Sequence, residues 1–540
     1  MSFDAVADLP LGNAGFSCIR QCNQIYVDKT ALIYALCRRK SSSVFLARPR
    51  RFGKSLLVST LESLFKDGLR DFQGLAIEKL WTDTTYPVVH LDFSAARDFQ
   101  DFEGFKKLFE LMLLRRFCTA GFVFDSESPD GVIGQLDSWM WALPNVSLVI
   151  LIDEYDAPLT ATLHEPQLFA LVQSLINRFF LTIKSCSASL RFFFMTGVTK
   201  LSNAGIFSGF NILEDISSDA EFGTLLGYTE DEIKENFGPR LERAAGALGL
   251  TQEALLEGLR TNYGGFCFDE DASTRVYCPW SVLNFLNDPD KTFQNYWFAS
   301  GGHPSLLVDL LRGNPLENPA VFDNPMLLES HVLAATQQNG AFSLPALLTQ
   351  AGYFTIKDVP TEGYVTLGYP NEEVRSSFAR LYAGELLRGA DRSRIEIVNL
   401  KRALEEGDVE AAVRILNLVF ASIDAARHPV TDEAACRGFL QVLLIGAAML
   451  PRVAVHTTHG ESVLELEAGR TCWVFDIKFA RRENEADALL SEGLQQMHSR
   501  EYGKTAHGLT LVRAVLVFDG AARAFTRFAL CDGPEGQTGN

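Results

Sequence analysis

The sequence predicts an α/β protein that begins with a parallel sheet covered by helices, continues through a helical middle region and ends in a second α/β domain. Three observations lead to this prediction. Up to about residue 225, short and continuously apolar runs alternate with stretches of helical periodicity, as in parallel sheets buried on both faces. From there to about residue 310 helical periodicity dominates. After Thr431 the pattern is helix, strand, strand, helix, strand.

The predicted elements of the first part alternate between strands and helices. We expect strands at 44–47, 88–92, 148–152 and 192–196, and helices at 54–65, 105–117 and 168–183. Farther along, a helix at 344–350 precedes strands at 353–357 and 364–368, an order compatible with a winged-helix unit. The last part should contain helices at 433–450 and 485–502 and strands at 463–466, 473–479 and 512–518. We therefore predict four regions, which are residues 1–225, 226–390, a helical connector at 391–425, and 426–540.

Composition and charge exclude several classes of protein. With 47% hydrophobic and 21% charged residues in a chain of 540, the composition is that of packed proteins and not of disordered ones. A formal charge of −18 argues against a surface that wraps a polyanion as a whole, although a local basic groove for DNA or RNA stays open. The first residues lack a secretory signal. The longest strongly apolar run, Val442–Leu450, is about half of the roughly 20 residues in a membrane span. We expect a cytoplasmic protein that crosses no membrane.

Residues 48–55 read Arg-Pro-Arg-Arg-Phe-Gly-Lys-Ser, between a predicted strand and a predicted helix. A nucleoside triphosphate needs backbone N–H groups around its phosphates, a lysine to neutralise them and a hydroxyl to hold Mg²⁺. A strand, a Gly-Lys-Ser turn and a helix supply all three. The residues expected to bind the cofactor, ATP with Mg²⁺, are Arg50, Arg51, Phe52, Gly53, Lys54 and Ser55. Arg48 replaces the first glycine of the usual pattern, so a chance Gly-Lys-Ser in an ordinary loop is the alternative.

A second motif strengthens this interpretation. The third predicted strand ends in Asp153 and Glu154. Asp153 would hold Mg²⁺ together with Ser55, and Glu154 would activate or orient the attacking water. We therefore expect Lys54, Asp153 and Glu154 to be catalytic. Thr196, at the end of the next strand, is expected to sense the γ-phosphate, with a plain loop role as the alternative. If Asp153 and Glu154 only cap a strand-to-helix turn, the chain is a parallel-sheet protein without turnover.

These motifs resemble a known family, the predicted AAA-ATPase-like proteins of bacteria, and the resemblance covers nearly the whole chain. The segments that carry it are Tyr26–Thr30, Ala47–Ser55, Asp153–Asp156, Thr196–Lys200, Tyr263–Phe266, Tyr277–Ser281, Tyr296-Trp297, Gly352–Ile356 and Gly368–Asn371. In that family the arginine-rich loop without its first glycine is the ordinary form. The resemblance implies a P-loop NTPase core followed by an α/β restriction-endonuclease-like domain of the PD-(D/E)xK type.

The C-terminal part departs from that family's pattern at one position. PD-(D/E)xK nucleases hold Mg²⁺ with an acid on one strand and an acid on the next, followed two residues later by a lysine that orients or activates water. Asp476 and Lys478 share one face of a predicted strand and fit the second half, and Gln496 matches a glutamine of the family. Val463 stands where the first acid is expected. The nearby carboxylates that could replace it are Glu461 and Glu465. The alternative is a degenerate domain without nuclease activity.

Two functions follow from this sequence. The first is an ATPase whose nuclease-like domain acts on or binds DNA or RNA. The second is an ATP-controlled switch or assembly protein whose degenerate C-terminal domain only binds a partner. The two functions differ in whether a second acid lies near Asp476 to complete a nuclease site. ATP is favoured over GTP because no Asn-Lys-x-Asp follows the fourth predicted strand, and a homo-oligomer stays open.

Overall fold

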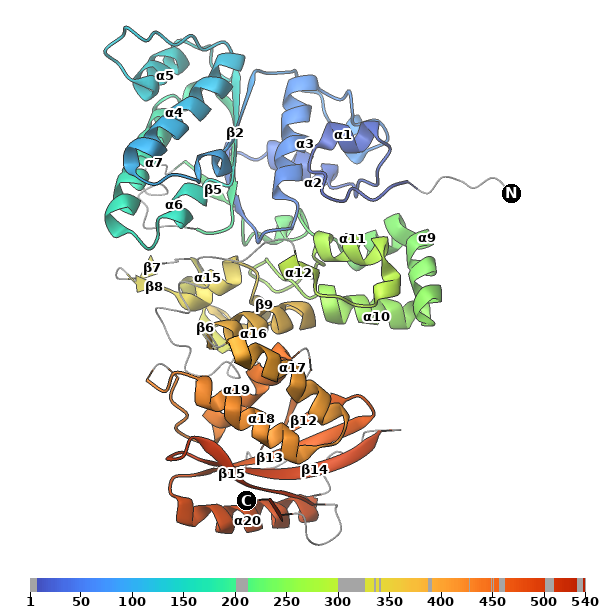
Figure 1. The fold of residues 1–540 in the computed structure, drawn as a ribbon. Coiled ribbons are helices and arrows are strands. Elements are labelled where there is room, and N and C mark those ends of the chain that lie inside the picture. The colour runs from blue at the N-terminus through green and yellow to red at the C-terminus, as the bar shows by residue number, and fades with distance from the viewer. Residues whose placement is uncertain are drawn as a thin grey trace. The chain divides into compact units, whose positions relative to one another are not determined.

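The computed structural model describes residues 7–200, 212–299, 326–334, 337–338, 341–386, 391–426, 428–447, 449, 451–455, 462–500, 509–531 and 538–539. The chain divides into two compact units (Figure 1). The first unit comprises Met1–Leu306 and Pro325–Glu373, and the second comprises Leu307–Asn324 and Val374–Asn540.

A five-stranded parallel sheet forms the core of the first unit. Its strands are β1 (Ser43–Ala47), β2 (Val88–Asp92), β3 (Leu148–Asp153), β4 (Leu190–Gly197) and β5 (Glu214–Asp215), in the order β2-β3-β4-β1-β5. Each pair of neighbours is parallel, so the carboxyl ends of all strands lie at one edge. The four predicted strands are confirmed. The fifth was not predicted because two residues show no periodicity.

Helices cover both faces of this sheet (Figure 1). One face carries α4 (Phe102–Thr119), α5 (Val132–Trp141), α6 (Ala157–Ala161) and α7 (Pro166–Ser185), and the other carries α1 (Phe16–Gln21), α2 (Thr30–Cys37) and α3 (Lys54–Asp67). Short 3₁₀ turns are η1 (Ala76–Lys79), η2 (Phe93–Ala96), η3 (Ser187–Ser189) and η5 (Ala220–Phe222). Every residue of β1 and β3 is buried, and Phe65 of α3 stacks on Phe192 of β4 with ring centres 5.3 Å apart. Burial on both faces explains why the strands are apolar without alternation.

The middle of the chain is helical and then forms a small antiparallel sheet. The helices are α9 (Glu230–Leu248), α10 (Gln252–Tyr263), α11 (Pro279–Asn287), η6 (Pro289–Lys291) and α12 (Tyr296–Ala299). The following elements are β6 (Met326–Glu329), α14 (His331–Ala334), β7 (Gln337–Gln338), β8 (Ala341–Phe342), α15 (Leu344–Gln350), β9 (Thr355–Thr361) and β10 (Tyr364–Gly368). The predicted order of one helix and two strands is present, and β6 pairs with β10 as a third strand. Leu9 and Val27, from the start of the chain, belong to the same apolar core as α9, α10 and α11.

The second unit packs helices with a mixed six-stranded sheet. Its helices are α16 (Glu372–Leu386), α17 (Asp391–Glu405), α18 (Val409–Ser422), α19 (Glu433–Gly446), η8 (Glu483–Glu485) and α20 (Ala486–Arg500). Its strands are β11 (Arg452–Val455), β12 (Ser462–Ala468), β13 (Thr471–Ala480), β14 (Thr510–Asp519), β15 (Ala524–Leu530) and β16 (Thr538–Gly539), hydrogen-bonded in that order. Only the pair of β13 and β14 is parallel among the pairings described, and α20 lies between these two strands in the chain. The predicted helices and strands are present, and β11, β15 and β16 are three further strands that were not predicted.

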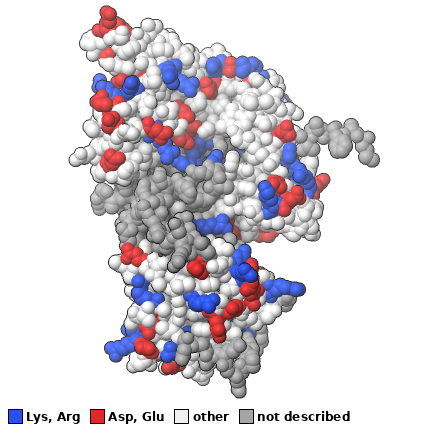
Figure 2. Space-filling view, in the orientation of Figure 1, with Lys and Arg blue, Asp and Glu red and all other residues white. Residues whose placement is uncertain are grey.

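Basic and acidic side chains are interspersed on the described surface that Figure 2 shows. They do not gather there into one continuous basic stripe. In the parts of the chain that the structure describes, none of the helices combines the length and the apolar character that crossing a bilayer requires.

Candidate functional site: a phosphate-binding loop with an acidic cluster

The predicted phosphate-binding loop lies between β1 and α3, at the carboxyl edge of the sheet. Two of its residues have left-handed backbone, Arg51 (φ +72°) and Gly53 (φ +95°). Glycine adopts this conformation freely, whereas for another residue it costs on the order of 1 kcal/mol or more. Gly53 immediately precedes α3. The unpaired N–H groups at the positive end of that helix are therefore available to an anion in the loop.

Lys54, the first residue of α3, is buried and reaches back across the loop. Its ammonium group donates to Arg48 O and Pro49 O, both at 3.0 Å. Burial lowers the pKa of Lys54, and carboxylates at the end of β3 oppose this shift. The loop thus encloses a cation beside the start of a helix, which is an arrangement that attracts phosphate.

Ser55 and Asp153 meet although they are 98 positions apart in the chain. The Ser55 hydroxyl donates to Asp153 Oδ2 at 2.6 Å. Burial raises the pKa of Asp153, and the nearby charge of Asp92 adds to that rise, while Ser55 and Lys54 act in the opposite direction. Asp92, which was not among the predicted site residues, is the register neighbour of Asp153 on β2. A hydroxyl and a carboxylate in contact fit Mg²⁺, which prefers oxygen ligands and takes few of them from the protein.

Glu154 is the acid of this cluster whose carboxylate has no structural role in the described residues. Its backbone is left-handed (φ +49°), which is uncommon for a residue other than glycine and is found at functional sites. Its backbone N–H donates to Asp153 Oδ1 at 2.9 Å. Among the described residues no hydrogen bond reaches its carboxylate. Burial raises the pKa of Glu154.

Asp156, by contrast, holds the turn that follows β4. Its Oδ2 accepts from Val198 N at 3.2 Å, from Thr199 N at 2.8 Å and from the Thr199 hydroxyl at 2.6 Å. A Cβ at Gly197 would lie 2.6 Å from Asp156 Oδ1, so only glycine permits this approach. The segment Thr196–Lys200 is therefore held against the acidic cluster by Asp156.

Thr196 lies beside the loop, but its hydroxyl is already used. The residue is fully buried, and its hydroxyl donates to Leu46 O at 2.7 Å. The two are register neighbours on β4 and β1. Contact between Thr196 and a phosphate would require this bond to break.

Arg48, at the place of the usual first glycine, points into the protein. Its guanidinium donates to Ala47 O, Ser217 O and Phe222 O at 2.9, 2.7 and 3.2 Å, and its centre lies 4.4 Å from the ring centre of Phe268. Burial lowers the pKa of Arg48 to about 10. The side chain therefore supports the loop from behind, while Arg50 is exposed on its surface.

Aromatic residues from the helical middle region hold the other side of the loop. The Phe52 ring is buried, and its centre lies 4.8, 5.0 and 6.4 Å from those of Phe266, Phe268 and Trp297. Edge-to-face aromatic pairs of this kind are worth about 0.5–1.5 kcal/mol each beyond burial. The segments around Phe266 and Trp297, for which the sequence predicted no role, therefore support the loop.

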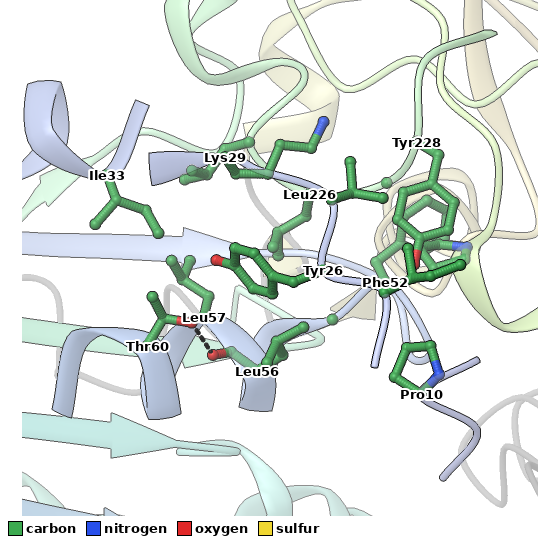
Figure 3. A pocket seen from close by; sticks show the side chains of 16 residues that line it. Pro10, Tyr26, Lys29, Ile33, Phe52, Leu56, Leu57, Thr60, Leu226 and Tyr228 are labelled. Atoms are coloured by element: carbon green, nitrogen blue, oxygen red, sulfur yellow. Dashed lines mark hydrogen bonds between the residues drawn. The ribbon is translucent and has the colours of Figure 1, made fainter. Parts of the chain in front are cut away.

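A pocket that is partly open to solvent adjoins the loop (Figure 3). Four parts of the chain line it: the N-terminal segment through α2, the loop with α3, the segment before α9, and the start of α11. The residues are Pro10, Ile25, Tyr26, Val27, Lys29, Ile33, Phe52, Gly53, Leu56, Leu57, Thr60, Leu225, Leu226, Gly227, Tyr228 and Pro279. The wall is mainly apolar, and Gly53 belongs both to it and to the loop. An apolar wall with few polar groups is the character of sites that bind small organic ligands.

Lys29 ties two walls of this pocket together. Its ammonium group donates to Thr224 O at 2.8 Å and to the Glu232 carboxylate at 2.6 Å. Glu232 also completes the capping box of Thr229 at the start of α9. The N-terminal segment is thereby joined to the helical middle region.

In the second unit, Asp476 and Lys478 lie on β13 and are both buried. Lys478 Nζ donates to Gln496 Oε1 of α20 at 2.6 Å and lies 3.6 Å from Asp476 Oδ2. On β12, Leu464 is opposite Phe475, so the same register brings Val463 next to Asp476. Of the two alternative acids, Glu465 is opposite Val474, and Glu461 lies outside the described residues.

The parallel sheet, the Gly-Lys-Ser turn into α3 and the acids that end β3 are the features of a P-loop nucleotide-binding protein. The family described as Predicted AAA-ATPase matches residues 10–207. A protein from Azotobacter chroococcum mcd 1, described as "Uncharacterized protein in vnfD 5'region", is 33% identical over 376 residues, which are 68% of each chain. The chain therefore belongs to the AAA-ATPase-like family.

The solved structures that are similar to this chain include the crystal structure of Cdc6p from Pyrobaculum aerophilum, with 12% identity and a TM-score of 0.27 over 87% of this chain and 92% of that one. A TM-score of this size does not define a shared fold.

Proposed function

We propose that this protein binds ATP with Mg²⁺ at the loop and hydrolyses it. The observation that carries the proposal is the contact between Ser55 and Asp153 beside Lys54, because it joins two oxygen ligands for Mg²⁺ to a cation that neutralises phosphate. The test is phosphate release by the purified protein with ATP or GTP, with and without Mg²⁺ and with DNA or RNA added. Mg²⁺-dependent release from ATP is expected. Absence of both nucleotide binding and release would contradict the proposal.

Each residue would take the role in ATP binding or hydrolysis that its contacts in the folded protein permit. Lys54 and the N–H groups of the loop would hold the phosphates, with exposed Arg50 at the entrance. Ser55 and Asp153 would hold Mg²⁺, which stabilises the charge that develops on the transferred phosphoryl group. Glu154, whose carboxylate is free of hydrogen bonds within the described residues, would orient or activate the attacking water. Thr196 would set the position of β4 relative to β1.

The apolar pocket supports a nucleotide whose base is buried beside the loop. Leu226 is buried in its wall, so Leu226→Asp should weaken ATP binding by about tenfold or more, because a desolvated carboxylate would face the base. Tripolyphosphate, which has no base, should bind wild type and variant equally. Calorimetry with both ligands measures the difference. The matched control is Leu250→Asp at an exposed position outside the pocket, and equal ATP affinity in Leu226→Asp would refute the base site.

The residues around Asp476 in the second unit argue against cleavage of nucleic acid. An active PD-(D/E)xK site needs a second carboxylate beside Asp476, and apolar Val463 stands there. Lys478 is engaged by Gln496. We therefore propose an ATP-controlled switch or assembly protein whose nuclease-like unit binds a partner, with DNA or RNA as candidates.

This proposal predicts little or no metal-dependent cleavage of DNA or RNA by the wild-type protein. It also predicts that Asp476→Ala keeps its ATP hydrolysis, because Asp476 is in the unit that does not contain the loop. Both are measured with labelled duplex and single-stranded substrates in Mg²⁺ or Mn²⁺, alongside phosphate release. If wild type cleaves and Asp476→Ala does not, the unit is a nuclease, and Glu461→Ala against Glu465→Ala would identify the second acid.

A further inference from the structure

Helices α11 and α12 present two tryptophans to the loop. The centre of the Arg51 guanidinium lies 4.3 Å from the ring centre of Trp280, at the start of α11. Trp297, in α12, is one of the aromatic neighbours of Phe52. Trp280 Nε1 donates to Tyr296 O at 3.2 Å and so ties the two helices together. The shape of the loop therefore depends on how α11 and α12 are held.

One buried carboxylate, that of Glu373, holds both helices. It accepts from the Ser281 hydroxyl at 2.7 Å and from the backbone N–H groups of Tyr296 and Trp297 at 2.6 and 2.9 Å. The two backbone donors begin α12, where N–H groups have no partner within the helix. Ser281 directly follows Trp280 in α11. Each helix is therefore hydrogen-bonded to Glu373 at its tryptophan or at the residue next to it.

Glu373 also stands at a junction in the chain. It is the second residue of α16 and the last residue of the first unit, and from Val374 onward the same helix belongs to the second unit. Burial raises the pKa of Glu373 to about 7, although the three donors act against this shift. Its carboxylate is therefore largely ionised at pH 8.

We propose that Glu373 is a positioning residue that links the phosphate loop to α16. Through Ser281 beside Trp280, and through Trp297, it keeps Arg51 and Phe52 in place, so that nucleotide binding at the loop and the order of α16 depend on each other. The inference rests on the proposed nucleotide binding. It adds a route by which the loop is connected to the helix that enters the second unit.

The experiment compares the wild-type chain with Glu373→Ala, Glu373→Gln and Ser281→Ala at pH 8. Calorimetry measures Mg-ATP affinity, and hydrogen exchange of residues 374–386 is measured with and without Mg-ATP. We expect nucleotide to slow exchange in this segment of the wild type. Glu373→Ala should weaken affinity by about tenfold or more, as displaced binding groups do, and should remove the nucleotide-dependent protection. Glu373→Gln, whose amide can accept from some of the donors and not from all, should lie between the two.

The matched control is Glu362→Gln, which removes the same charge at an exposed position in the turn between β9 and β10. It should behave as wild type. If wild type fails to bind Mg-ATP, the proposed function is wrong and the inference falls with it. If wild type binds, but affinity and protection are unchanged in the Glu373 variants and in Ser281→Ala, the inference alone is overturned. Should Glu373→Ala fail to fold, Glu373→Gln and Ser281→Ala decide the outcome.

Discussion

Replacement of Lys54 by alanine is expected to abolish Mg-ATP binding while the protein stays folded. Lys54 is the buried cation inside the loop, and its ammonium group bonds only to the backbone oxygens of Arg48 and Pro49 among the hydrogen bonds described. Without it, phosphates would meet the acids at the end of β3 with no compensating charge in the loop. A loss of about a hundredfold or more in affinity, near 3 kcal/mol, is expected. Calorimetric titration with Mg-ATP measures it.

The control for this prediction is Lys66→Ala. Lys66 is in the last turn of the same helix and is exposed, so its loss changes the net charge equally but leaves the loop intact. Circular dichroism and thermal unfolding check that both variants fold. A folded Lys54→Ala protein with wild-type affinity would refute the assignment of the phosphate loop.

The second large effect is expected for Glu154→Gln, which should retain ATP and lose hydrolysis by about a hundredfold or more. The amide keeps the size of the side chain but cannot take a proton from water. Because no hydrogen bond reaches the Glu154 carboxylate in the described structure, the substitution should leave the unfolding temperature nearly unchanged. Single-turnover phosphate release and ATP affinity, measured separately, distinguish loss of chemistry from loss of binding.

Asp156→Ala provides the contrast two residues farther on. Its carboxylate accepts from Val198 and Thr199 in a buried turn, so its removal should destabilise the protein by about 1–3 kcal/mol. Denaturant unfolding measures this loss. Full hydrolysis in Glu154→Gln would move the role of orienting water to another group, with Asp92 beside Asp153 as the first to examine.

The parallel sheet could be predicted because its signals are local. Residues 148–152 are apolar throughout since both faces of β3 are covered, and the acids directly after them fall at the sheet's edge whatever the strand order is. The same logic placed Lys54 and Ser55 at the start of a helix after β1. The contact of Ser55 with Asp153 follows from two strand ends that share one edge. Parallel pairing of these strands is all that the prediction required.

Other features could not be predicted because they depend on contacts between distant segments. The hydroxyl of Thr196 faces β1 and not an open loop, which only the adjacency of β4 and β1 decides. The roles of Trp280 and Trp297 could not be predicted for the same reason, because a motif that contains tryptophan does not indicate which loop the ring contacts. Glu373 carries no local signal at all, because its partners come from α11 and α12.

The amino-acid sequence alone was sufficient to locate the phosphate loop and its acids, because each is a short run whose chemistry is complete within a few residues of a strand end. The sequence could not show which of these carboxylates are hydrogen-bonded to other residues in the folded protein. Asp153 is held by Ser55 and Asp156 by the turn after β4, whereas the carboxylate of Glu154 has no hydrogen bond in the described structure. That division arises from the packing of β1, β3 and β4 side by side. The sequence likewise could not show that a loop lacking its first glycine is shaped by Arg48 from behind and by aromatic rings in front, because those partners meet only when the chain has folded.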